Sequence, residues 1–302
     1  MHTLGATLKQ LRLDSHLTQS ELYGGIVSRS FAGRLERGEH DIAVEKFFQI
    51  LNRLHVTADE FRFVQQDYQP TAATLLKSRT HLAYEQENFP WLHHLEQRYH
   101  HSLDPQQQEL ATVADILLKS FGSTNWQITP AMEQLWQRMT NAPTWHLYDL
   151  DIANAWLSIT YQKHDNATLL AGIAKMHASS QRYLQAPADP FHVIDTRASF
   201  DLVALQILFW NHQYAEAQAF RRQLLPENQP NLGTDGALTI QVCLCLWEWF
   251  FGDQHAGDLR ADRLMAISWI PAAANIHSLL ASYQAHARHF REKHPEWQNP
   301  HA

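Results

Sequence analysis

The chain has 302 residues, enough for two domains, and 45% of them are hydrophobic. Its 24 basic and 31 acidic residues give a formal net charge of −7, so no chain-wide basic surface marks a general nucleic-acid binder. No apolar run reaches the ~18 residues of a membrane span, and the N-terminus leads into an amphipathic helix instead of a signal peptide. We therefore expect a cytoplasmic protein with no membrane partner.

The first 66 residues have the pattern of a five-helix domain. One apolar stripe at helical spacing runs through residues 4–11, and another runs through residues 47–54. Between them, Thr18 and Ser28 are suited to cap the starts of two short helices. Thr57, followed by two carboxylates, marks the start of a fifth helix that ends near Gln66.

The helices that follow Thr18 and Ser28 are separated by a tight turn, as in a helix-turn-helix. The second helix of such a motif lies in the DNA major groove, and its leading turn meets base edges. Arginine in that position can bind guanine or phosphate, and residues of the flanking helices lie along the phosphate backbone. The residues expected to contact DNA are Arg12, Gln19, Ser28, Arg29, Ser30, Phe31, Arg34 and Arg37. The alternative is that these arginines are ordinary solvated surface residues of a helical domain.

These motifs resemble the N-terminal domain of the Rgg/GadR/MutR regulators of Gram-positive bacteria. The resemblance covers about the first 65 residues and rests on Ser28-Arg29-Ser30, on the run from Arg34 to Glu39 and on Asp59-Glu60-Phe61. Tyr23 departs from the family, which usually has alanine there. The resemblance implies a cytoplasmic, sequence-specific DNA-binding regulator that senses short signalling peptides.

Residues 67–80 are polar around Pro70 and predict a linker or a linker helix. Residues 81–302 predict helices joined by short breaks, with no strand pattern. Three similar turns, at residues 163–167, 211–217 and 252–256, suggest degenerate tetratricopeptide-like repeats. The predicted fold is therefore all-α, a DNA-binding domain followed by a helical-repeat solenoid for ligand binding and dimerisation.

A concave solenoid face can hold an extended peptide, and a peptide ligand is implied here by the resemblance. Polar residues that interrupt apolar helices are candidate contacts, because an extended peptide has backbone groups that need hydrogen-bond partners. These candidates are Asn154, Arg197, Asp201, Asn211 and Gln241. Ordinary solvated polarity is the alternative for each. Aromatic residues such as Trp156, Trp210 and Trp247 could line apolar pockets, or they could belong to the core.

The last helix carries a candidate dimer contact. Apolar residues recur at near-helical spacing between Ala272 and Phe290, which would suit a self-complementary stripe in a homodimer. The alternative is that this stripe caps the solenoid.

Enzymatic motifs, cofactor motifs and a convincing metal-ligand set are not found. Cys243 and Cys245 lie two residues apart in one apolar helix, so their side chains diverge and cannot bind one metal ion together. We therefore predict that both are buried free thiols. The 20 histidines include His286 and His289 at helical spacing, but no other ligand completes a site around them. The remaining alternatives are a regulator that senses a small molecule or metal ion, and a helical-repeat interaction scaffold.

Overall fold

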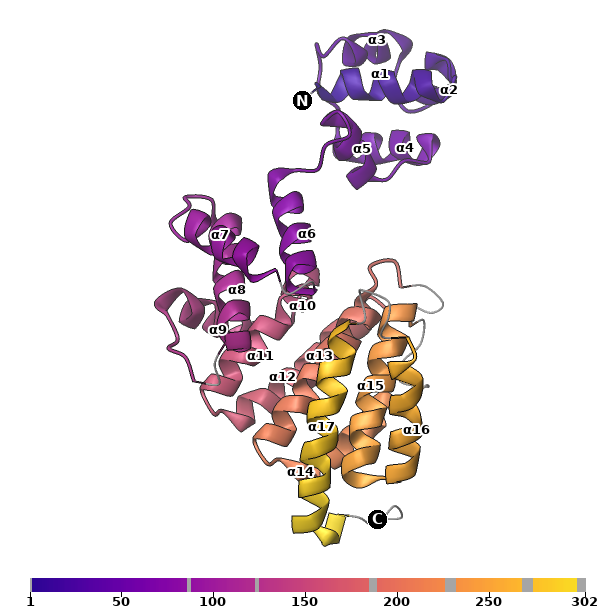
Figure 1. Cartoon of the computed structure of the whole chain (residues 1–302). Helices are drawn as coiled ribbons and strands as arrows, with labels where there is room; N and C mark the ends of the chain where they lie inside the picture. The colour runs from indigo at the N-terminus through magenta and orange to yellow at the C-terminus, as the bar shows by residue number, and fades with distance from the viewer. Residues whose placement is uncertain are drawn as a thin grey trace. The chain divides into compact units, whose positions relative to one another are not determined.

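The structure is a computed structural model that describes residues 2–85, 88–122, 125–184, 189–225, 232–267 and 274–297. Helices and their connections account for all of these residues, and no strand occurs among them (Figure 1). The predicted all-α class is therefore confirmed. The chain divides into two compact units, Met1–His81 and Leu82–Ala302.

The N-terminal unit contains the five predicted helices. They are α1 (Leu4–Asp14), α2 (Gln19–Tyr23), α3 (Arg29–Glu36), α4 (Val44–Leu54) and α5 (Ala58–Gln65). A further helix, α6 (Ala72–Glu85), runs from residues of this unit into the next.

The helix starts follow from the predicted caps. Thr18 and Glu21 form a reciprocal capping box at α2, in which the Glu21 backbone N–H donates to Thr18 Oγ1 over 3.2 Å. Ser28 accepts from the backbone N–H of Phe31 at 3.2 Å, and Thr57 accepts from that of Glu60 at 3.1 Å. These side chains fix the first residues of α2, α3 and α5.

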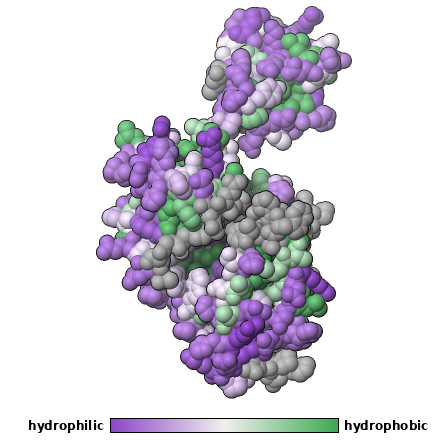
Figure 2. All heavy atoms as spheres, in the orientation of Figure 1, coloured by the Kyte–Doolittle hydropathy of each residue, from purple (hydrophilic) through white to green (hydrophobic). Residues whose placement is uncertain are grey.

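Apolar side chains from all five helices form the core of this unit. Leu8, Leu22, Leu35 and Ile50 have no exposed surface. In the face shown in Figure 2, hydrophilic residues cover most of this unit around a smaller hydrophobic area. The exposed apolar side chains of the unit include Val44 and Phe48 on α4.

Gly5 lets α1 approach α3 closely. A Cβ atom at Gly5 would lie 1.7 Å from the carbonyl oxygen of Leu35. Because that obstacle is helix backbone, it cannot rotate away. The position of α3 against α1 therefore depends on this glycine.

Replacing Gly5 by alanine is expected to destabilise the N-terminal unit by about 1–3 kcal/mol, since overpacking forces the two helices apart. The matched control is Gly33→Ala on α3, where a new Cβ would meet only Arg37 Nη1 at an ordinary 3.6 Å. Alanine is the better helix former by about 1 kcal/mol, so the control should be neutral or stabilising. Urea unfolding followed by circular dichroism distinguishes the two; an unchanged midpoint for Gly5→Ala would contradict the close contact.

The C-terminal unit is an array of helices. They are α7 (Phe89–Tyr99), α8 (Pro105–Gly122), α9 (Pro130–Asn141), α10 (Leu147–Asp151), α11 (Ala153–Gln162), α12 (Asn166–Gln181), α13 (Val193–Trp210), α14 (Tyr214–Ala219), η1 (Phe220–Leu224), α15 (Thr234–Phe251), α16 (Gln254–Met265), α17 (Ala274–Lys293) and η4 (Pro295–Trp297).

The three similar turns each join two helices of a repeat. They connect α11 to α12, α13 to α14 and α15 to α16. The first two turns use His164 and His212 in the left-handed conformation, with φ of 53° and 55°, which ends the preceding helix. The first helices of successive pairs pack side by side, α11 on α13 and α13 on α15, and α17 continues the series (Figure 1). The predicted helical-repeat arrangement is therefore confirmed.

The repeats have tightly packed interiors. A Cβ atom at Gly172 of α12 would come within 2.1 Å of the Trp156 ring of α11. Trp156, Trp249 and Phe250 are at least 96% buried, so core packing explains them. Cys243 and Cys245 are buried free thiols, as predicted, and burial raises the pKa of both.

The apolar stripe of the last helix is covered by its own chain. Tyr283 and Phe290 are each 5% exposed, and Phe290 packs 5.1 Å from the ring centre of Phe250 on α15. Leu280 and Ala287 are buried as well. The stripe therefore caps the array and is not available as a dimer surface. Ala272, where the predicted stripe begins, lies outside the described residues.

Candidate functional site

Helix α3 presents a polar, cationic face to solvent. Arg29, Ser30 and Arg34 are exposed, whereas Ala32 and Leu35 on the opposite side are completely buried. Ser28 is exposed at the cap. This distribution leaves the leading turn and one side of α3 open to a partner.

Two of the other residues expected to contact DNA already make contacts within the N-terminal unit. Phe31 is half-buried and stacks on His40, with ring centres 5.7 Å apart and planes inclined by 9°. Arg37 donates to Glu39 over 2.5 Å, and both side chains are largely exposed. Because an exposed ion pair contributes little, Arg37 can exchange this carboxylate for another anion.

Arg12 lies in the interior of the unit and not on its surface. Its guanidinium donates to both carboxylate oxygens of Glu36, at 2.7 and 3.0 Å, and to the carbonyl of Leu17 at 2.8 Å. The two charged side chains are 10% and 4% exposed. This burial corrects the expected role of Arg12: it links α1 to α3 and does not face phosphate.

The carboxylate of Glu36 is held ionised by its neighbours. Burial by itself would raise the pKa of Glu36, but hydrogen bonds from Arg12 and Gln19 lower it below its usual range. Gln19 donates through Nε2 to Glu36 over 2.8 Å and is half-exposed. Its contact with phosphate stays a prediction. Burial raises the pKa of Tyr23, which remains a neutral phenol beside this pair.

The five residues predicted to bind peptide do not form one site. Arg197 is 3% exposed and Asp201 is fully buried, where its carboxylate meets His177 of α12 at 2.8 Å. Burial lowers the pKa of the Arg197 guanidinium, an effect that nearby Asp201 and Asp189 oppose. Both predictions are therefore corrected: these side chains lie inside the array, and Asp201 links α13 to α12.

Asn211 and Gln241 are also tied within the chain. Asn211 donates through Nδ2 to Asn166 over 2.7 Å, which joins the turn after α13 to the start of α12. The side-chain oxygen of Gln241 accepts a hydrogen bond from Arg260 of α16. Their roles as peptide contacts are not supported by this geometry.

Asn154 has a different environment. It is half-exposed and donates through Nδ2 to Ser199 of α13 over 3.2 Å, while its Oδ1 atom has no hydrogen-bond partner. A buried acceptor without a partner costs about 1–3 kcal/mol. A donor from a ligand would recover that free energy.

Asn154 belongs to a face formed by two packed helices, which we call the α11–α13 face. On α11 the face consists of Asn154, Ser158 and Tyr161, which are three or four residues apart. On α13 it consists of Ser199, Val203, Gln206 and Trp210. All of these side chains are half-buried or exposed. The two helices run in the same direction here, because Asn154 meets Ser199 and Tyr161 meets Trp210, with ring centres 5.6 Å apart. The face is polar at one end and aromatic at the other.

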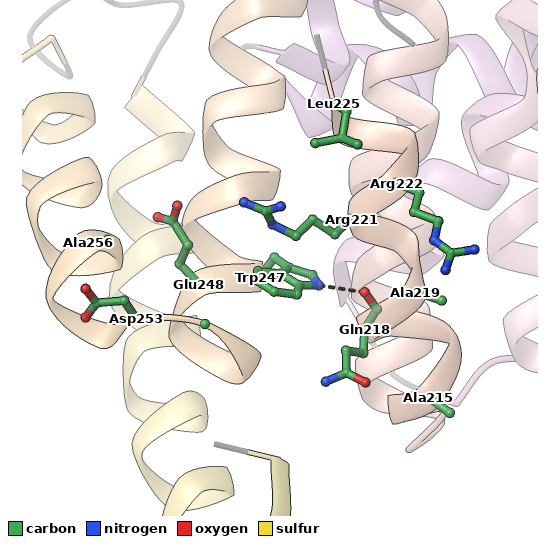
Figure 3. A pocket seen from close by; sticks show the side chains of 11 residues that line it. Ala215, Gln218, Ala219, Arg221, Arg222, Leu225, Trp247, Glu248, Asp253 and Ala256 are labelled. Carbon is green, nitrogen blue, oxygen red and sulfur yellow. Dashed lines mark hydrogen bonds between the residues drawn. The ribbon is translucent and has the colours of Figure 1, made fainter. Parts of the chain in front are cut away.

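A separate hollow lies between α14–η1 and the adjoining ends of α15 and α16 (Figure 3). Its volume is about 560 Å³. The Trp247 indole N–H donates to the carbonyl of Gln218 at 2.9 Å, and the Arg221 guanidinium lies 4.9 Å from the ring centre of Trp247. Glu248, the neighbour of Trp247 on α15, is paired with Arg260. The hollow thus offers an indole surface and a cation to a small ligand.

Metal coordination has no support in the described part of the chain. No three or more His, Cys, Asp or Glu side chains come together there in a way that could hold an ion. None of the helices in the described ranges combines the length and apolar character that a bilayer crossing requires.

The sequence of residues 8–61 matches the helix-turn-helix family. This segment includes α2, the tight turn and α3 with its exposed arginines. Residues 8–61 are a helix-turn-helix domain.

Solved structures share the fold of the whole chain. The pheromone receptor Rgg2 of Streptococcus dysgalactiae is 19% identical, with a TM-score of 0.67 over 94% of this chain and 98% of that chain. A candidate transcriptional regulator of Listeria monocytogenes EGD-e is 18% identical, with a TM-score of 0.67 over 97% and 99%. PlcR of Bacillus thuringiensis, solved with the peptide PapR7 and DNA, is 13% identical, with a TM-score of 0.59 over 95% and 99%. No curated protein matches the chain in sequence.

Sequence reasoning missed one residue that positions the helix-turn-helix. Arg53 of α4 donates through Nη1 to the carbonyls of Leu22 and Gly24, both at 2.8 Å, and so satisfies the end of α2. This contact holds α2 against α4 just before the turn. Its only sequence signal is an arginine near the end of α4, which by itself does not identify a partner 31 residues away.

Proposed function

We propose that the protein is a sequence-specific DNA-binding transcriptional regulator controlled by a short linear peptide. The observation that carries this proposal is the capped α3 of a helix-turn-helix domain, with exposed Arg29 and Arg34, in a chain that has the fold of PlcR. Arginine at such positions can bind guanine bidentately or clamp phosphate. The activity belongs to the cytoplasm and requires no catalytic step.

We assign DNA binding to residues 1–66, and ligand binding and dimerisation to residues 81–302, with 67–80 as the connection. Two helix-turn-helix domains of a homodimer would bind half-sites about one DNA turn, ~34 Å, apart. Since the α17 stripe is buried within its own chain, the dimer contact has to use another surface.

The α11–α13 face supports the peptide part of the proposal. An extended peptide needs hydrogen-bond partners for its backbone and contact surface for its side chains. The unpartnered Oδ1 of Asn154 provides the first, and exposed Trp210 provides the second. If the peptide binds one arrangement of the repeats with ~100-fold higher affinity than another, it shifts the equilibrium between them by about 2.7 kcal/mol. This is enough to change promoter occupancy strongly.

The direct test is calorimetry of the full chain with synthetic peptides encoded beside its gene, followed by gel shifts on its own promoter with and without the peptide that binds. We expect a dissociation constant below ~100 μM for the peptide, and a DNA affinity that changes when the peptide is bound. Asn154→Ala should weaken peptide binding about tenfold, because it removes the buried side-chain oxygen that accepts a hydrogen bond from the peptide backbone. Asn211→Ala, which alters a turn contact outside the α11–α13 face, is the control.

The second candidate is a regulator that senses a small molecule, and the hollow beside Trp247 favours it. If no peptide binds while a metabolite raises the melting temperature and alters DNA affinity, the small-ligand function replaces the peptide function. Arg221→Ala should then remove the metabolite effect.

A further inference from the structure

Trp210 is unusual among the tryptophans of the repeats. Trp145, Trp156 and Trp249 are at most 2% exposed, whereas Trp210, at the last residue of α13, is 47% exposed. Its indole therefore keeps a large apolar surface in water. Exposed tryptophans of this kind are enriched among the residues that dominate binding.

Two tyrosines from other helices flank this indole. Tyr161 of α11 lies 5.6 Å from it between ring centres, and Tyr283 of α17 lies 6.5 Å from it with the ring planes inclined by 30°. Tyr283 is in turn packed against Phe209 and Phe250. Three helices thus fix one aromatic group, which we call the aromatic seat and define as Tyr161, Trp210 and Tyr283.

The seat also contains an unsatisfied polar atom. Tyr283 is 5% exposed, and its hydroxyl has no hydrogen-bond partner. Burial raises the pKa of Tyr283, with a smaller contribution from nearby Tyr161, so the phenol stays neutral. A buried hydroxyl without a partner is costly, and a backbone carbonyl of a bound peptide next to the seat would accept a hydrogen bond from it. This observation is independent of the exposure of Trp210.

The distance from Asn154 to the seat is set by α11. Asn154 and Tyr161 are separated by seven residues of the helix, and at ~1.5 Å per residue this is about 10 Å. An extended peptide covers ~3.3 Å per residue, so about three of its residues fit between the two points. A peptide whose backbone meets Asn154 therefore places a side chain about three positions away over the seat.

We propose that the aromatic seat selects a bulky apolar side chain of the bound peptide, about three residues from the backbone group held by Asn154. This inference rests on the proposed peptide function and adds a ligand class to it: linear peptides with Leu, Ile, Met, Phe or Trp at one fixed position. None of the three seat residues carries a charge, so a charged residue there would be desolvated without an opposite charge to pair with, and it is rejected.

The experiment selects random heptapeptides displayed on phage against the immobilised full chain, for the wild type and three variants. On the wild type, the selected peptides should carry an apolar residue at one fixed position. With Trp210→Ala that preference should disappear, and a peptide selected on the wild type should bind about tenfold more weakly, the loss expected when one side chain is no longer buried. Trp210→Phe should retain the preference.

The matched control is Leu259→Ala on α16, whose side chain is 45% exposed and lies outside the α11–α13 face. It should select the same peptides as the wild type, and unchanged circular dichroism shows that each variant is folded. If the peptides selected on Trp210→Ala still carry an apolar residue at the fixed position, the aromatic seat is overturned while the peptide function stands. If no heptapeptide is enriched on the wild type, both are overturned.

Discussion

The double variant Arg29→Ala/Arg34→Ala is expected to lose specific promoter binding. Each arginine lies exposed on α3, and an arginine that reads a base contributes about 1–3 kcal/mol, so the pair should cost at least ~30-fold in affinity. The loss should be greater for the promoter than for unrelated DNA, because base contacts specify sequence whereas phosphate contacts do not.

Gel-shift titrations at two salt concentrations measure this loss. Arg62→Ala is the matched control, since it removes an exposed arginine from α5, outside the helix-turn-helix pair. Its effect on specific binding should be small. Unchanged affinity in the double variant would remove α3 as the DNA-reading helix.

The variant Glu36→Ala is expected to unfold the N-terminal unit or come close to it. It leaves the Arg12 guanidinium buried without its carboxylate, and removing one partner of a buried ion pair costs about 3–5 kcal/mol. Domains are stable by only ~5–15 kcal/mol, so DNA binding should fail although no residue of the DNA face has changed. Amide hydrogen exchange of α1–α3 in the full chain measures the destabilisation directly.

Glu39→Ala is the control for this variant, because it breaks the exposed pair with Arg37 and should change hydrogen exchange little. Equal protection of α1–α3 in Glu36→Ala and in the wild type would contradict the role of the buried pair.

The same pair gives the N-terminal unit a pH dependence. The pKa of Glu36 is lower in the folded unit than in the unfolded chain. Its contribution to stability is therefore complete above the usual glutamate pKa and is lost as the pH falls from there through the folded value. Thermal unfolding of the wild type should become easier in this acidic range, and Glu36→Ala should lack this component.

The sequence by itself determined the local structure of the helix-turn-helix domain. The caps at Thr18, Ser28 and Thr57 were predictable because a capping side chain bonds to a backbone N–H only three residues away. The apolar stripes and repeat turns were predictable for the same reason: helical spacing places partners three or four residues apart. The exposed arginines of α3 follow from these caps, since a fixed helix start fixes which side faces the core.

Only the tertiary structure decided which polar residues remain available. Arg12 has the same pattern as a surface arginine, but its partner Glu36 lies 24 residues away, and long-range packing buries both. Asp201 likewise meets His177 across two helices, and the apolar stripe of α17 is covered by α15 instead of a second copy. Tyr161, Trp210 and Tyr283 come together from three helices. Helical periodicity predicts the face on which a residue lies, but the element that covers that face depends on how distant helices pack.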